Sequence, residues 1–221
     1  HRAQPEQRRM RMDWAEMATP AAKAGAGFEE KAFFEYHLYT LPRPATLANN
    51  EIKQISMFEP ATAQVEKELH YQADPGNKDV KVIIKMKNNE AVGLGMPLPA
   101  GRARVFKADS DGSLILLGED RIDHTPRNEE IKLTVGEAFD VVGETTEVSR
   151  RRISDKVYET DYRIEVRNQK DKATRVTVSK RLGGFWEILN PSADYVKKSA
   201  SEVEWKLDIP AEDKAVIDFT V

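Results

Sequence analysis

From Phe33 onward the chain alternates apolar and polar residues in short runs that end at Pro, Gly, Asn or Asp. This period of two is typical of β-strands that have one buried face and one exposed face. No run in this part of the chain shows the longer period of an amphipathic helix. The pattern predicts strands in the first half of the chain at 33–41, 51–58, 62–72, 79–87, 102–108, 113–121 and 130–135.

The alternation is cleaner in the second half of the chain. The segments 168–173 and 210–215 separate apolar runs there, and their Asn, Asp and Pro residues favour hairpin turns. About six strands within about 80 residues are typical of an immunoglobulin-like sandwich. The apolar residues predicted to share the inner faces are Tyr162, Ile164, Val166, Val176, Val178, Val203, Trp205, Leu207, Ile209, Ile217, Phe219 and Val221.

A chain of 221 residues is long enough for two small domains, each with its own core. We therefore expect an all-β protein with two consecutive β-sandwich units, the second immunoglobulin- or fibronectin-like, preceded by an extended N-terminal arm. The expected division is an arm or linker at 1–30, a first unit at 31–140 and a second unit at 141–221.

The segment GMPLPAGRARVF, residues 95–106, contains two prolines and two glycines. Pro97 and Pro99 donate no backbone hydrogen bond, so the segment cannot continue the interior of a sheet. Its glycines do not follow the G-x-G-x-x-G spacing of a phosphate-binding loop, and no helix is expected after them. We predict a corner between two strands here, not a ligand-binding loop.

Composition excludes several kinds of chemistry and partner. The net charge of −3 and the 32% of charged residues are those of an ordinary soluble surface, so no nucleic-acid partner is expected. The absence of cysteine excludes disulfides, thiolate nucleophiles and cysteine-bound zinc. No apolar run approaches the roughly 20 residues of a transmembrane helix. Because the chain begins at His1 without a leader, we expect either a processed mature form or an excised fragment.

Four blocks of the sequence, in this order, resemble the domain of unknown function family 4139. The most distinctive parts are PLPAGRARVF and EDRIDHTP, and the resemblance covers nearly everything after the arm. It implies an all-β module found mostly in exported bacterial proteins, and therefore a periplasmic, secreted or cell-surface location. It brings no established activity or catalytic residue. The four blocks are 33–59, 95–126, 136–142 and 166–188.

Two segments carry side chains that could serve a cation site or acid–base chemistry. Asp109 and Asp111 precede Gly112 as in the first half of a calcium loop, but the Asp-Gly pair favours a hairpin turn. His124 follows several carboxylates, but the alternation of a strand sends these to both faces, so we expect it to bond a turn. The serines lack a G-x-S-x-G elbow. We therefore predict no catalytic residue, no metal ligand and no cofactor.

Two further segments are candidates for binding surfaces. The basic run SRRRIS, residues 149–154, is predicted to be a charged strand edge that resists aggregation, with a surface for acidic partners as the alternative. Phe185 and Trp186 would point to opposite faces of an extended segment, so one ring is expected in the core and the other near the surface. Trp186 is the candidate platform for stacking a sugar.

The N-terminal arm, residues 1–27, is rich in Arg, Gln and Ala but carries a group of large apolar side chains. Met10, Met12 and Trp14 alternate with charged residues, as in a strand. Met10, Trp14 and Met17 also have helical spacing, so the pattern leaves both structures open. We expect these residues to bind a partner surface. Either the arm folds back over its own sandwich, or it adds a strand to the sheet edge of a neighbouring copy.

These observations predict a non-catalytic extracytoplasmic protein with a structural, assembly or adhesion role. Its expected partners are copies of itself, and an open contact between copies would give a filament. One alternative is a carbohydrate-binding accessory module that holds a glycan at Trp186. Another is a hydrolase whose site the sequence does not reveal.

Overall fold

The structure of the chain is a computed structural model that describes residues 29–33, 36–41, 44–58 and 60–221. Nearly all regular structure in these ranges is β, which confirms the predicted all-β class. The described residues contain no α-helix, only a single 3-10 turn at Glu90–Val92. None of their helical segments is long and apolar enough to cross a membrane. The chain divides into two compact units, 1–60 and 61–221.

In the first unit the described strands form one hairpin, β1 (Glu29–Phe33) and β2 (Tyr36–Thr40), which pair antiparallel. The strand predicted at 33–41 is thus β2 together with the end of β1. The segment 51–58, also predicted as a strand, has no regular structure in its described residues, and its Ile52 is 98% exposed. The apolar residues of this segment alternate as in a strand, but they do not form a buried face. The prediction of a strand at 51–58 is therefore wrong.

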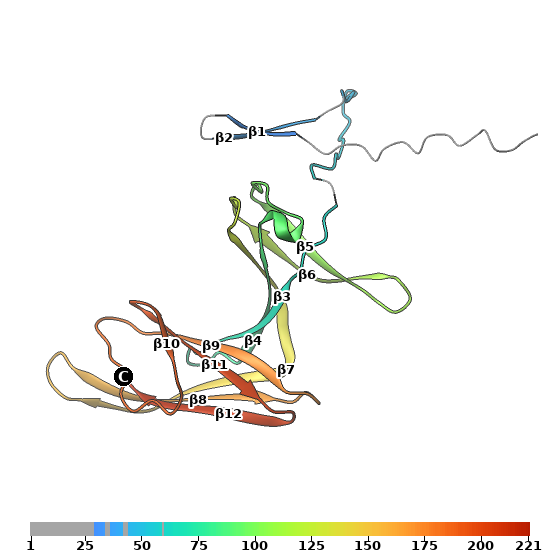
Figure 1. Cartoon of the computed structure of the whole chain (residues 1–221). Helices are drawn as coiled ribbons and strands as arrows, with labels where there is room; N and C mark the ends of the chain where they lie inside the picture. Colours follow the sequence, from blue (N-terminus) through green and yellow to red (C-terminus); the bar gives the residue numbers. More distant parts are fainter. Residues whose placement is uncertain (1–28, 34–35, 42–43, 59) are drawn as a thin grey trace, which may run out of the picture. The chain divides into compact units, whose positions relative to one another are not determined.

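The second unit is built on one eight-stranded mixed sheet with the strand order β10-β11-β9-β3-β4-β7-β8-β12 (Figure 1). All neighbouring strands pair antiparallel except β3 and β9, which are parallel. The strands are β3 (Glu66–Gln72), β4 (Asp79–Lys87), β7 (Glu130–Arg152), β8 (Tyr158–Asn168), β9 (Thr174–Arg181), β10 (Val196–Ser199), β11 (Glu202–Ile209) and β12 (Asp213–Thr220).

This sheet bends so strongly that strands from its two ends face each other across one core. In Figure 1, β9 and β11 lie across from β8 and β12. The rings of Trp205 and Phe219, on β11 and β12, have centroids 5.0 Å apart. The bend coincides with register shifts between β4 and β7, where Gly136 adopts a φ of 152°. Irregularities of this kind increase the local twist of a sheet.

The alternating apolar residues of the second half do form this core. Ile164, Val166, Val176 and Val178 are fully buried, and Tyr162 packs partly buried against them. Burial of each such aliphatic side chain contributes about 1.5–3 kcal/mol relative to its exposure. The predicted inner faces of these strands are confirmed.

The division between the structural units differs from the one expected at residue 140. Residue 140 lies inside β7, which runs without a break from Glu130 to Arg152. The strands β3 and β4 pair with β9 and β7, and their Tyr71 and Val80 are buried in the same core as the later strands. Strands from both halves of the chain therefore share one sheet and one core, because pairing joins residues that are distant in sequence.

The two polar connections predicted as hairpins join strands that do not pair. β8 pairs with β7 and β12, whereas β9 pairs with β11 and β3, and β11 and β12 are not neighbours either. The buried side chain of Asn168 holds both connections together. Its amide nitrogen donates to the carbonyl oxygens of Lys172, Ile209 and Pro210. One side chain therefore fixes two crossings between opposing parts of the sheet.

The remaining strands of the unit, β5 (Gly101–Ala108) and β6 (Leu114–Ile122), form a separate two-stranded hairpin. Its turn uses the predicted Asp-Gly pair, since the backbone N–H of Gly112 donates to the carbonyl of Asp109 at 3.0 Å. The proline-rich segment before β5 is indeed a corner. The amide of the buried Asn88 donates to the carbonyls of Met96 and Pro126 there, at 2.8 Å each.

Candidate functional site

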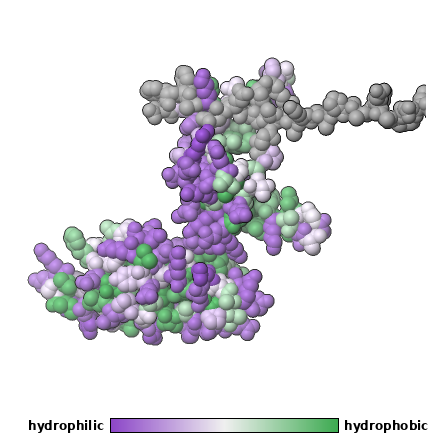
Figure 2. Space-filling model, in the orientation of Figure 1, coloured by the Kyte–Doolittle hydropathy of each residue, from purple (hydrophilic) through white to green (hydrophobic). Residues whose placement is uncertain are grey.

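The β5–β6 hairpin carries a surface of exposed apolar residues. They are Phe106, Leu114, Ile115, Leu116 and Leu117, here called the hairpin surface, and each is close to half exposed or more. Because four of them are consecutive in one strand, they point to both faces of the hairpin. In Figure 2 the hairpin, on the right, shows hydrophobic residues beside hydrophilic ones. Exposed apolar side chains gathered on one short element make it a candidate for a contact site.

The root of the hairpin is fixed to β7 although its outer part is not. A Cβ at Gly118 would overlap the carbonyl of Val135, so the two backbones lie in close contact. The carboxylate of Asp120 accepts a hydrogen bond from the backbone N–H of Thr134 at 2.7 Å. Arg104 also forms an ion pair with Glu119 at 2.7 Å across the hairpin. The hairpin surface is therefore presented by a firmly attached element.

A groove of about 740 Å³ opens at one end of the large sheet, between the β7–β8 turn and the segment after β9. We call it the end groove. Its aromatic lining includes Tyr158, Tyr162 and Phe185, and Phe185 is fully exposed. Arg150 and Arg181 bring positive charge to its lining. The groove therefore combines rings with cationic groups.

A buried ammonium lies next to the inner wall of the end groove. Lys180 is 3% exposed, its Nζ is 4.1 Å from the centroid of the Tyr162 ring, and it donates to the carbonyl of Ala73 at 3.0 Å. Burial lowers the pKa of Lys180, while the negative charges of Asp74 and Glu147 act in the opposite direction. This cation is held by a ring and a carbonyl, and it lies beneath the surface that a ligand would touch.

Trp186, the predicted sugar platform, lines the end groove but is partly buried against the core. Its indole N–H donates to the carbonyl of Ala200 at 2.7 Å. The ammonium of Lys197 lies 4.1 Å from its ring centroid. Phe185 is instead the open ring of this pair, which agrees with the expectation that one ring lies near the core and the other near the surface.

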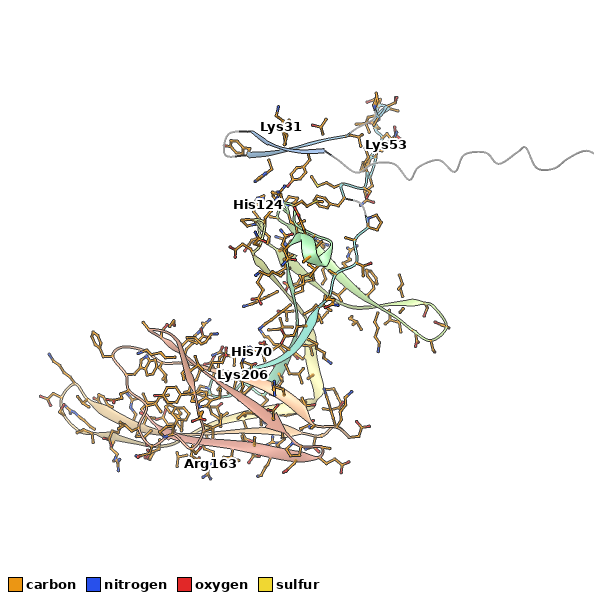
Figure 3. The ribbon with its side chains drawn as sticks, viewed as in Figure 1. Lys31, Lys53, His70, His124, Arg163 and Lys206 are labelled. Atoms are coloured by element: carbon orange, nitrogen blue, oxygen red, sulfur yellow. The ribbon has the colours of Figure 1, made fainter. Side chains whose placement is uncertain are left out.

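His124, the acid–base candidate, serves the corner between strands. Its Nδ1 accepts a hydrogen bond from the backbone N–H of Ala100 at 3.2 Å. Figure 3 shows it well apart from His70. The carboxylate of Asp120 accepts hydrogen bonds from the backbone N–H groups of Arg121 and Thr134. Within the part of the chain that the structure describes, no three His, Asp or Glu side chains are grouped to hold a metal ion.

The predicted binding residues of the arm, Met10, Met12, Trp14 and Met17, lie outside the described residues. The hairpin surface and the end groove were not predicted from the sequence. The sequence predicts the run from Leu114 to Leu117 only as a strand, because a run of apolar residues does not reveal whether another element covers it. Four apolar residues in a row without alternation are the signal that could have suggested an uncovered strand.

The basic run begins on the outer part of β7, as the predicted strand edge requires. Arg151 pairs there with Glu159 at 2.6 Å, and Arg152 pairs with Asp155 at 2.5 Å.

No protein-family model, curated protein or solved structure matches the chain. Its function must therefore be inferred from these surfaces and their chemistry.

Proposed function

We propose that this is a non-catalytic extracytoplasmic protein with an assembly or adhesion role, in which copies of the chain bind one another through the hairpin surface. The observation that supports this proposal is the run of exposed apolar residues from Leu114 to Leu117 on a hairpin with no third strand among the described residues. An isolated two-stranded hairpin is at best marginally stable in water, and the outer part of this one extends beyond its attachment to β7. A partner that covers its apolar faces would stabilise it.

The proposed occupant of the hairpin surface is the N-terminal arm of a neighbouring copy. An extended arm would place Met10, Met12 and Trp14 on one face, which matches the apolar residues of the hairpin. The arm segment RRMR at 8–11 is basic, whereas the hairpin turn carries Asp109 and Asp111. Addition of a strand with complementary charge is a known mode of peptide recognition.

The immunoglobulin-like sandwich belongs to the same proposal. Trp205 and Phe219, which belong to opposing parts of the bent sheet, pack against each other as the two layers of a sandwich would. Adhesive proteins outside the cytoplasm often use such domains, and the resemblance to family 4139 also implies export. The absence of cysteine is compatible with this location.

Light scattering tests the proposal through the molar mass of the protein in solution. We expect the full chain to form assemblies larger than one copy, and removal of residues 1–27 to return it to the mass of one copy. The double variant Leu114→Thr/Leu116→Thr should have the same effect, because it removes the apolar contact. Ile52→Thr is the control, since Ile52 is even more exposed than these two leucines but lies outside the hairpin.

Two results would contradict the proposal. One is a full chain that has the mass of a single copy at all concentrations tested. The other is an assembly whose mass is the same with and without the arm. A loss of mass in the Ile52→Thr control would show instead that exposed apolar residues cause nonspecific association.

A further inference from the structure

We propose that the outer part of β7, residues 143–152, together with the end groove, binds an acidic and extended peptide segment of a partner protein. This site is separate from the hairpin surface and does not depend on the proposed assembly of copies. Three observations support it: an unpaired strand edge, cations without carboxylate partners and exposed rings.

The first observation is the free edge. β4 pairs with β7 only as far as Val142, whereas β8 continues to pair with β7 up to Arg152. Residues 143–152 therefore have a strand on one side only within the described chain. On the other side, the N–H of Gly143 donates to the carbonyl of Lys78, and no strand follows. Backbone N–H and C=O groups along such an edge can pair with an added strand.

The second observation is the charge at this edge and in the groove. Arg150, Lys156 and Arg181 have no carboxylate partner among the described residues, in contrast to Arg151 and Arg152 on the same strand. Within the described chain, two acidic residues of the site have no ion pair, Glu187 in the lining and Glu147 on the edge, against three such cations. Glu159 and Glu144 are already bound to arginines. The surplus of positive charge matches acidic side chains on the ligand.

The third observation is the set of rings. The guanidinium of Arg150 lies 4.9 Å from the centroid of the Tyr158 ring, and both line the groove. Phe185 follows Gly183 and Gly184 and is fully exposed, while Trp186 anchors this segment through its bond to Ala200. Tyr, Trp and Arg are the side chains that contribute most of the binding energy at protein interfaces.

The strand edge favours a peptide over a glycan as the occupant. Its donors and acceptors repeat at the spacing of a polypeptide backbone, which a polysaccharide does not reproduce. Charge also excludes the arm of a second copy as the occupant, because the arm segment at 8–11 is itself basic. A basic edge repels another basic edge, so it prevents pairing between copies and still accepts an acidic strand.

Fluorescence anisotropy tests the site with a defined probe. The probe is a labelled peptide of alternating Glu and Val, about nine residues long, which is the length of a strand. We expect it to bind the full chain, and the double variant Arg150→Glu/Arg181→Glu to bind at least about tenfold more weakly, because the reversed charges repel it. The control is Arg163→Glu/Arg175→Glu, which changes the net charge by the same amount. These two arginines lie outside the groove, where they pair with Asp218 and Asp208.

A second probe tests the pairing with the edge. The same peptide with alternate backbone nitrogens methylated keeps its charge but cannot complete the ladder, so we expect it to bind much more weakly. Equal binding of the methylated and unmethylated probes would overturn strand addition. Equal binding to both double variants would overturn the groove as the site. Binding of a heparin fragment without binding of the peptide would identify a glycan as the ligand and would also overturn the proposal.

Discussion

At the residue scale, the burial of single polar side chains decides local structure and pH dependence. Asn88 and Asn168 are completely buried, and each satisfies several backbone carbonyls from distant segments. An unsatisfied buried carbonyl costs about 1–3 kcal/mol, so each asparagine stabilises the chain crossings around it. Lys180 is a different case, because its charge is buried without a carboxylate in contact.

The burial of Lys180 predicts a specific dependence of stability on pH. Its pKa is lowered in the folded state, so the unfolded chain binds this proton more tightly. While the lysine of the unfolded chain is protonated, its burial lowers the free energy of unfolding. This destabilisation decreases as the pH rises toward the ordinary lysine pKa of about 10.4. We expect the free energy of unfolding of the wild type to rise relative to that of Lys180→Met as the pH increases toward this ordinary lysine pKa.

Urea unfolding of both proteins across this pH range measures the effect. The control is Lys206→Met, which removes an exposed lysine from β11 and should leave the pH dependence of the wild type unchanged (Figure 3). A constant difference between the wild type and Lys180→Met at every pH would show that the buried ammonium carries no such cost.

At the element scale, the β5–β6 hairpin depends on one close contact between backbones. Gly118 leaves no space for a side chain against Val135, and the neighbouring Asp120 bonds the backbone N–H of Thr134. These contacts attach the hairpin to β7, while its outer residues remain exposed. The sequence predicted both strands and their turn, but it could not predict this attachment, because it joins residues of different strands.

Gly118→Ala is expected to loosen the hairpin from β7. The added methyl group would overlap the carbonyl of Val135, so one backbone must move, at a cost of about 1–3 kcal/mol. Hydrogen exchange should then be faster at Thr134 and little changed in β8 and β9. Gly183→Ala is the control, because its Cβ would meet open space. Unchanged exchange at Thr134 would show that the contact is not needed to hold the hairpin.

At the scale of the whole molecule, one core stabilises the second unit. The buried hydrophobic residues among those described all lie between Leu69 and Phe219, and none lies in the described residues of the first unit. The strands that contribute them come from both halves of the sequence. Stability should therefore depend on the second unit alone.

The fragment 61–221 is thus expected to unfold in a single transition with the same midpoint as the full chain. The described buried hydrophobic residues all lie in this fragment, and a single compact unit unfolds cooperatively as a rule. Thermal unfolding followed by circular dichroism compares the two proteins. A midpoint many degrees lower in the fragment would reveal that residues 1–60 contribute to the folded core.

The sequence by itself determined the all-β class, the turn at Asp109–Gly112, the corner at Pro97 and the inner faces of the later strands. These features follow from local properties, namely the side-chain period of a strand and the dihedral angles that Gly and Pro allow. Only the tertiary structure decided that β3 joins β9, that the sheet bends over one core, and which apolar residues and strand edges stay uncovered. Pairing and coverage depend on residues distant in the chain, and the alternation of a single strand carries no information about its neighbour.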